Sequence, residues 1–179
     1  MKKLTFLALS LVLFVACTTE VKHEKKTEPA AAEMKTPPAE FADMKYAETG
    51  KKMIASLANG DMAGYLSAYA DNAVYQWNNG DSLAGKAAIT EYWTKRRTEF
   101  LDSLSFSNEI WLPVKVNQPQ SVEAPGVWLL AWYQVNAKYK NGNKMVQWMH
   151  LDFHFDANDK VDRVVHYVDR VPINAALAK

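Results

Sequence analysis

The fold is decided by the stretch GVWLLAWYQVNAKYKNGNKMVQWMHLDFHFD, residues 126–156. Two runs rich in aliphatic, aromatic and β-branched residues flank the dipeptide Asn-Gly at 141–142. Asn-Gly between two strands is the strongest short signal for a two-residue hairpin turn. The sequence therefore predicts a long antiparallel hairpin whose strands are joined by these two residues.

A two-residue turn sets the register of the hairpin and thereby its two faces. It places Trp132 opposite Leu151 and Tyr133 opposite His150, because side chains alternate between the faces of a strand. One face is then continuous aromatic and aliphatic surface, which we expect helices to cover. It is formed by Trp128, Leu130, Trp132, Leu151, Phe153 and Phe155.

The opposite face carries histidines and an aspartate at alternate positions, surrounded by apolar residues. An exposed apolar patch on a sheet is typical of a partner surface. We therefore predict a homodimer whose contact includes Tyr133, Trp148, His150, Asp152 and His154.

A metal site is not expected on this face. His150 and His154 are four residues apart on one strand, which is roughly 13 Å, whereas zinc ligands each lie about 2 Å from the ion. The sequence predicts neither a metal nor any other cofactor.

The beginning of the chain has the layout of a secretory signal peptide, predicted over residues 1–16. Lys2 and Lys3 precede an apolar run that is too short to span a bilayer comfortably. The run ends in LFVAC, which resembles the lipobox of a bacterial lipoprotein. This resemblance implies lipidation of Cys17 and a place in the bacterial cell envelope, as an outer-membrane lipoprotein. The alternative is a free thiol beside a secretory cleavage site.

Composition separates a tether from a folded domain. Residues 17–42 are rich in Lys, Glu, Ala and Pro and are predicted to be flexible, whereas residues 43–179 have the size of one domain with its own core. The chain has 21 Lys and Arg against 20 Asp and Glu, and removal of Lys2 and Lys3 leaves 19 basic residues. This balance does not predict nucleic-acid binding.

Hydrophobic periodicity divides the domain into helices followed by strands, which is an α+β layout. Arg96 lies on the apolar stripe of the third helix, where it either extends along the edge of the core or contacts an anion. Helices are predicted within residues 44–60, 61–71 and 87–101, and strands, besides the hairpin, within 73–77, 106–116 and 160–171.

Three segments resemble the nuclear transport factor 2 family, especially its SnoaL-like and ketosteroid isomerase-like branches. They are SLANGDMAGYLSAYADNAVYQW at 56–77, LAGKAAITEYW at 83–93 and DFHFDANDKVDRVVHYVD at 152–169. The similarity covers residues 43–171. It implies a cystatin-like cone, in which three N-terminal helices pack on the concave side of a curved, mainly antiparallel sheet and leave an apolar pocket at the open end.

The resemblance does not extend to the chemistry of ketosteroid isomerases. The positions of the oxyanion-hole tyrosine, the aspartate base and the second acid of those enzymes fall on Met53, Trp77 and Leu151. None of these side chains supplies the base or the oxyanion donor that this reaction needs. Steroid isomerisation is therefore not expected.

The predicted pocket is mostly apolar, which suits a small apolar or aromatic ligand. His166 is its one residue that can titrate near neutral pH, and it is the candidate catalytic residue; the alternative is a hydrogen-bonded core histidine. The predicted walls are Tyr65, Tyr69, Trp77, Trp128, Trp132, Gln134, Met149, Leu151, Phe153 and His166.

Three functions follow from these features. The first is a membrane-tethered domain that binds a small apolar or aromatic ligand, and the absence of a paired acid and base favours it. The second is a SnoaL-like lyase, isomerase or hydrolase that uses His166, and the third is a non-catalytic dimeric interaction protein. The expected partners are a small apolar molecule, the membrane through Cys17 and a second copy of the chain.

Overall fold

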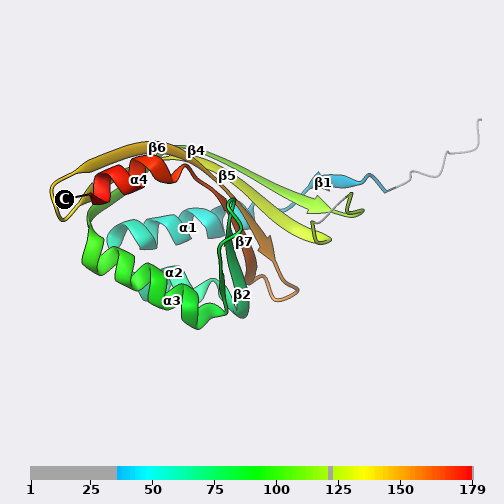
Figure 1. The fold of residues 1–179 in the computed structure, drawn as a ribbon. Helices are drawn as coiled ribbons and strands as arrows, with labels where there is room; N and C mark the ends of the chain where they lie inside the picture. Colours follow the sequence, from blue (N-terminus) through cyan, green and yellow to red (C-terminus); the bar gives the residue numbers. More distant parts are fainter. Residues whose placement is uncertain (1–35, 121–122, 179) are drawn as a thin grey trace, which may run out of the picture. The chain divides into compact units, whose positions relative to one another are not determined.

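The computed structural model describes residues 36–120 and 123–178. The predicted signal peptide and Cys17 lie outside these residues. The described chain forms one mixed sheet that curves around α1, with the other helices on the same side (Figure 1). No helix in these residues is long and apolar enough to cross a membrane.

The predicted order was helices followed by strands, but the structure also has strands among the first helices and a helix at the end. In chain order they are β1 (Ala39–Phe41), α1 (Lys45–Asn59), α2 (Met62–Ser67), β2 (Tyr69–Trp77), β3 (Ser82–Ala84), α3 (Lys86–Lys95), the π-helical η1 (Arg96–Phe100), β4 (Leu101–Val116), β5 (Gly126–Tyr139), β6 (Lys144–Phe155), β7 (Val161–Tyr167) and α4 (Arg170–Leu177). The order across the sheet is β1-β4-β5-β6-β7-β2-β3. All neighbouring strands run antiparallel except β2 and β7, which are parallel. The described residues therefore form an α+β fold.

The long hairpin forms as predicted, but its predicted register is wrong by one residue. Ala131 pairs with Leu151, and Trp132 pairs with His150. The backbone N–H of Tyr139 donates to the carbonyl of Asn143, so the connection is a three-residue loop that starts at Lys140. The loop ends at Gly142, whose φ of 92° is left-handed and favours glycine. The Asn-Gly signal thus marked the hairpin correctly but not the number of loop residues.

This shift of one residue turns every side chain of β5 to the other face of the sheet. Leu129, Ala131 and Tyr133 are buried on the concave side, whereas Trp128, Trp132 and Gln134 belong to the convex side. On β6 the predicted faces agree with the structure, because Leu151 and Phe153 are buried on the concave side. The error is therefore confined to one strand of the hairpin.

Two elements near the predicted pocket differ from their predicted form. The second helix ends at Ser67, so Tyr69 lies at the start of β2 and not on a helix. The last strand ends at Tyr167, and the chain continues as α4. Asp169 caps α4 by accepting a hydrogen bond from the Val171 N–H, which ends the strand and starts the helix.

The hairpin loop holds the far end of α4. The side-chain amides of Asn141 and Asn143 both donate to the carbonyl of Ala176 and also to that of Ala178. These carbonyls have no partner within the helix, because the last turn of a helix leaves its acceptors free. The Asn residues that marked a turn thus also fix α4 over the concave side of β6.

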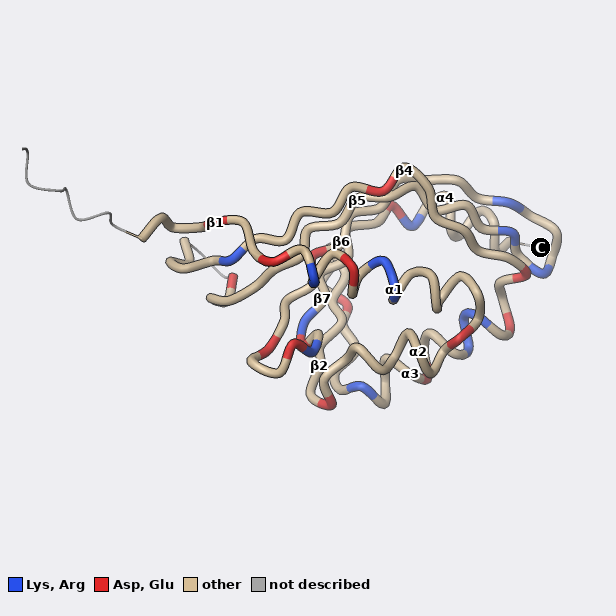
Figure 2. Tube along the Cα trace, turned by 180° about the vertical axis from the view of Figure 1, so that it is seen from behind, with Lys and Arg blue, Asp and Glu red and all other residues tan. Residues whose placement is uncertain are grey.

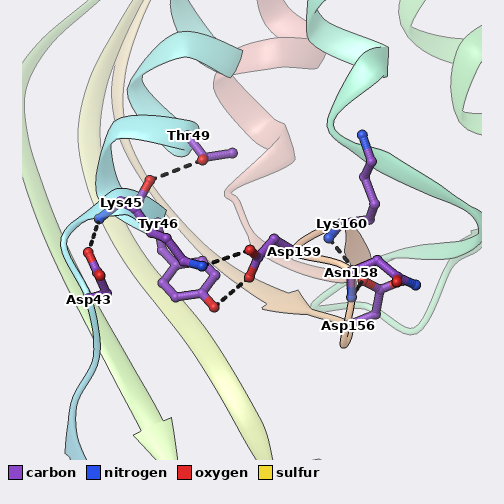
Figure 3. A network of polar contacts seen from close by, with 8 residues as sticks. All are labelled: Asp43, Lys45, Tyr46, Thr49, Asp156, Asn158, Asp159 and Lys160. Carbon is purple, nitrogen blue, oxygen red and sulfur yellow. Dashed lines mark hydrogen bonds and ion pairs between the residues drawn. The ribbon is translucent and has the colours of Figure 1, made fainter.

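The start of α1 is fixed to the turn between β6 and β7 (Figure 3). The Asp159 carboxylate accepts from the Lys45 ammonium and from the Tyr46 hydroxyl, each at 2.7 Å. Asp156 shapes the same turn by accepting from the backbone N–H groups of Asn158 and Lys160. These contacts place α1 against the sheet, where it contacts β4 and β5.

The edges and the surface complete the fold. Residues 39–41, which lie inside the predicted tether, instead form β1 and extend the sheet beside β4 by backbone pairing, with all three side chains exposed. Acidic and basic positions are interspersed over the described chain (Figure 2), in keeping with the near balance of charges in the sequence.

Candidate ligand-binding cavity

A cavity of about 160 Å³ lies between the concave side of the sheet and the helices α1, α3 and α4. An apolar cavity of about 150 Å³ in another protein is large enough to bind benzene. The space therefore fits a molecule with about one aromatic ring. Its walls include Met53, Leu57, Tyr133, Met149, Phe153 and Ile173.

Six of the ten residues predicted to form the pocket line this cavity, and four do not. Tyr69 does not line the cavity, but its hydroxyl lies 2.8 Å from that of Tyr65, which does. Trp128, Trp132 and Gln134 lie on the convex side, and the predicted register of β5, which is wrong by one residue, had placed them in the pocket. The six that line the cavity are Tyr65, Trp77, Met149, Leu151, Phe153 and His166.

Sequence reasoning missed several walls of the cavity. Tyr133 and Val135 take the place of Trp132 and Gln134, and a correct loop length would have identified them. Ile173 comes from α4, whose start was signalled by an aspartate followed by a proline in the first turn. Tyr75 and Trp93 also line the cavity, and both lie in elements that were predicted correctly.

His166 is positioned by the two strands that flank β7. It pairs with Leu151 of β6 and Trp77 of β2, and its side chain is buried on the concave side. Its Nδ1 atom is 2.8 Å from the Tyr75 hydroxyl, whereas its buried Nε2 atom has no hydrogen-bond partner in the part of the chain that the structure describes. Because His166 lines the cavity, Nε2 is an unsatisfied polar atom in the cavity wall as the described residues form it.

The imidazole of His166 is neutral at physiological pH. Burial, with a smaller effect from the positive charges of Arg96 and Arg170, lowers the pKa of His166 to about 3. A neutral imidazole can donate or accept one hydrogen bond at Nε2, depending on which role Nδ1 takes toward Tyr75. A group with so low a pKa is a weak general base.

Trp93 supplies a second buried polar atom without a partner. The ring packs edge-to-face against Tyr65, Tyr75 and Tyr92, with centroids 5.9, 5.8 and 5.3 Å apart, which fixes its orientation. Its Nε1–H is buried and makes no hydrogen bond with the described residues. An indole nitrogen can only donate, so this position calls for an acceptor.

The other ionisable side chains that line the cavity in the described residues are those of tyrosines and two arginines. Burial raises the pKa of Tyr75 and Tyr133 well above the ordinary tyrosine value, so both stay protonated. No aspartate or glutamate in the described part of the chain lines the cavity. The site can therefore bind and orient a molecule, but it lacks a carboxylate that could act as an acid or a base.

The residues predicted for a dimer contact do not all share one face. Trp148, His150, Asp152 and His154 lie on the convex side, whereas Tyr133 is buried on the concave side. The predicted register of β5, which is wrong by one residue, had placed Tyr133 on the convex side. The convex side does expose apolar side chains, namely those of Ile110, Leu112, Val146, Trp148 and Tyr167.

The two histidines of the convex side are held by neighbours. His150 stacks between Trp132 and Tyr167, with ring centroids 4.3 and 5.2 Å away. His154 is buried, with Nδ1 2.5 Å from an Asp162 carboxylate oxygen and Nε2 3.1 Å from the Pro125 carbonyl. Residues 36–120 and 123–178 contain no group of three or more His, Cys, Asp or Glu placed to hold a metal ion.

Comparisons with known proteins find similarity in structure and not in sequence. No family model matches the chain, and no curated protein matches it. A candidate polyketide cyclase from Pseudomonas putida superposes with a TM-score of 0.61 at 18% identity, over 74% of this chain and 98% of its own. An LEH-like epoxide hydrolase from M. tuberculosis gives 0.54 at 13% identity, over 75% and 90%.

A third solved structure was determined with a small molecule bound. It is a protein with a ketosteroid isomerase-like fold from Catenulispora acidiphila, in complex with trimethylamine. It gives a TM-score of 0.53 at 9% identity, over 73% of this chain and 92% of its own. Other matching structures are described as NTF2-like proteins. The described chain therefore has the NTF2-like α+β fold, which SnoaL-like and ketosteroid isomerase-like proteins share.

Proposed function

We propose that this protein binds a small apolar or aromatic molecule in the cavity between the concave side of the sheet and α1, α3 and α4. The observation that carries the proposal is a pair of buried polar atoms, Trp93 Nε1 and His166 Nε2, that have no hydrogen-bond partner among the described residues. Both belong to the wall of a cavity lined mostly by apolar and aromatic side chains. Buried polar groups in native proteins are almost always hydrogen-bonded. A ligand with an apolar body and few polar atoms would satisfy both.

Native mass spectrometry of the full chain, purified from producing cells without refolding, tests this proposal. We expect a reproducible small-molecule adduct on the wild-type protein and its loss in Ala137→Leu, because Ala137 lines the cavity and a larger side chain fills it. Circular dichroism checks that the variant is folded. No adduct on either protein, or equal adducts on both, would contradict the proposal.

The enzymatic alternative, a SnoaL-like lyase, isomerase or hydrolase using His166, has weaker support. In its favour, matching structures include a candidate isomerase and an epoxide hydrolase. Against it, His166 has a pKa of about 3, and no carboxylate in the described residues lines the cavity. Turnover of an identified ligand that is lost in His166→Gln, with binding intact, would overturn our preference for binding.

We also propose that the domain is tethered to the bacterial outer membrane through a lipid on Cys17. The motif LFVAC and the Lys, Glu and Pro-rich segment after it support this proposal. In a bacterial host fed alkyne-tagged palmitate, the wild-type chain should be labelled and should sediment with membranes. Cys17→Ser should be unlabelled and released, and labelling of that variant would rule out Cys17 as the anchor.

The convex side of the sheet is the surface that we propose for a homodimer. Its exposed apolar residues on β4, β6 and β7 support this proposal, with Trp148 52% exposed. Light scattering of the full-length Cys17→Ser chain should give twice the monomer mass, and adding Trp148→Glu should give the monomer mass. A monomer mass for the Cys17→Ser chain with Trp148 intact would refute the dimer and leave the exposed patch unexplained.

A further inference from the structure

Arg96 is the arginine of the cavity wall whose charge is not neutralised within the described chain. Arg170, which also lines the cavity, pairs with Asp81 at 3.1 Å and lies over the ring of Trp77. Arg96 makes no ion pair with a described residue, and its one hydrogen bond is a long one of 3.5 Å to the Tyr139 hydroxyl. Its guanidinium group therefore has donors to spare at the cavity.

The neighbouring Arg97 differs from Arg96 in the direction of its side chain. Its guanidinium donates to the carbonyls of Leu57 and Ala58 at the end of α1 and to that of Leu101. Arg97 thus has a structural role, in which it satisfies acceptors that the end of a helix leaves free. Arg96, one residue earlier, is directed to the cavity, and it begins the π-helical η1. Such π-turns are frequent at functional sites.

Arg96 and Trp93 both line the cavity, and the indole N–H of Trp93 has no hydrogen-bond partner among the described residues. The two residues are three positions apart, and the backbone is α-helical at Lys95 and Arg96, so their side chains are neighbours. Both groups can only donate. One oxygen-bearing group of a ligand could therefore accept hydrogen bonds from both.

The charge of the cavity wall selects among the possible acceptors. The described residues that line it include two arginines and neither an aspartate nor a glutamate. Guanidinium groups bind carboxylates through short, charge-assisted hydrogen bonds with two oxygens. A neutral acceptor would leave the charge of Arg96 without a partner at the edge of an apolar cavity, which is unfavourable.

We propose that the ligand is a small monocarboxylate with an apolar body of about one aromatic ring, and that its carboxylate binds Arg96 and the indole N–H of Trp93. This inference rests on the proposed binding function and names the ligand class. The apolar body occupies the space between Met149, Leu151 and Phe153. Arg96 is then the residue that determines specificity for a negative charge.

Two probes of nearly the same size and shape, one charged and one neutral, test the proposal, namely 3-phenylpropanoate and 3-phenylpropanamide. Isothermal titration of the full chain at low salt should show the carboxylate binding at least about tenfold more tightly than the amide, since hydrogen bonds to charged groups are the stronger ones. In Arg96→Met this preference should vanish. The matched control is Lys95→Met, which removes an exposed positive charge one residue away and should keep the preference.

The outcomes separate this inference from the function on which it rests. If the amide binds as tightly as the carboxylate to the wild-type chain, the carboxylate class is refuted and the binding function stands. If the preference survives in Arg96→Met, the role of Arg96 is refuted. If neither probe binds at millimolar concentration, both the inference and the proposed cavity function fail.

Discussion

Lowering the pH from 7.5 to 5 is expected to reduce the free energy of unfolding of the wild-type chain by about 2 kcal/mol more than that of His166→Gln. The cause is the buried imidazole of His166, whose pKa is lowered from 6.5 to about 3, first by burial and then by the nearby positive charges. The folded state holds this histidine neutral, whereas the unfolded chain takes up a proton as the pH falls below about 6.5. Acid therefore favours the unfolded state.

The sign and the pH range follow from the direction of this shift. The stabilisation from a neutral His166 is complete above the unfolded pKa and is lost as the pH falls toward the folded pKa of about 3. Urea unfolding of both proteins at several pH values between 5 and 7.5 measures the difference. Glutamine is a suitable replacement because its amide can still bond to the Tyr75 hydroxyl but does not titrate. Parallel pH profiles for the two proteins would contradict a buried neutral imidazole.

Gly50→Val is expected to destabilise the fold by about 3 kcal/mol, the upper part of the usual range for overpacking a core. Gly50 lies where α1 meets the sheet, and a Cβ atom there would come within 2.6 Å of both Leu129 Cδ2 and Trp111 Cζ3. Leu129 is fully buried, so it has little room to move. The branched valine side chain makes the clash larger than that of a single methyl group.

The control for this substitution is Ala55→Val in the same helix. Ala55 is exposed, so valine there tests only the lower helix propensity of a β-branched residue, which costs roughly 0.5 kcal/mol. Thermal and urea unfolding of the two variants should differ by more than about 2 kcal/mol. Equal destabilisation would show that α1 does not approach the sheet as closely as the structure indicates.

The sequence predicted the elements better than their exact registration. Alternation of apolar residues identified β6, and both its faces were assigned correctly, because Leu151 and Phe153 alternate with the polar residues His150, Asp152 and His154. In β5 apolar residues occupy both faces, so alternation could not choose between them. The choice rested on the loop length, and the structure has one more loop residue than an Asn-Gly turn. This one additional loop residue places Trp128, Trp132 and Gln134 on the convex side, outside the cavity that they were predicted to line.

The polar part of the cavity was harder to predict for a different reason. Trp93 and Arg96 both lie within the predicted third helix. The sequence does not show that the indole N–H has no partner among the described residues or that the arginine lacks an ion pair with them. Both facts depend on which side chains of distant elements surround them. Arg96 and Arg97 are adjacent in sequence, and only the fold brings the carbonyls of α1 to Arg97.

The central claim, that the cavity is a binding site, is tested most directly by the indole N–H signal of Trp93 in a ¹⁵N-labelled full chain. The chain has six tryptophans, and those of Trp111 and Trp128 already donate to Glu109 and to the Ala124 carbonyl, so they serve as internal references. On titration with neutral 3-phenylpropanamide, we expect the Trp93 signal to move progressively to saturation while these two stay in place. A Trp93 signal that does not move at saturating probe, or that moves no more than the signals of Trp132 and Trp148 on the convex side, would contradict binding in the cavity.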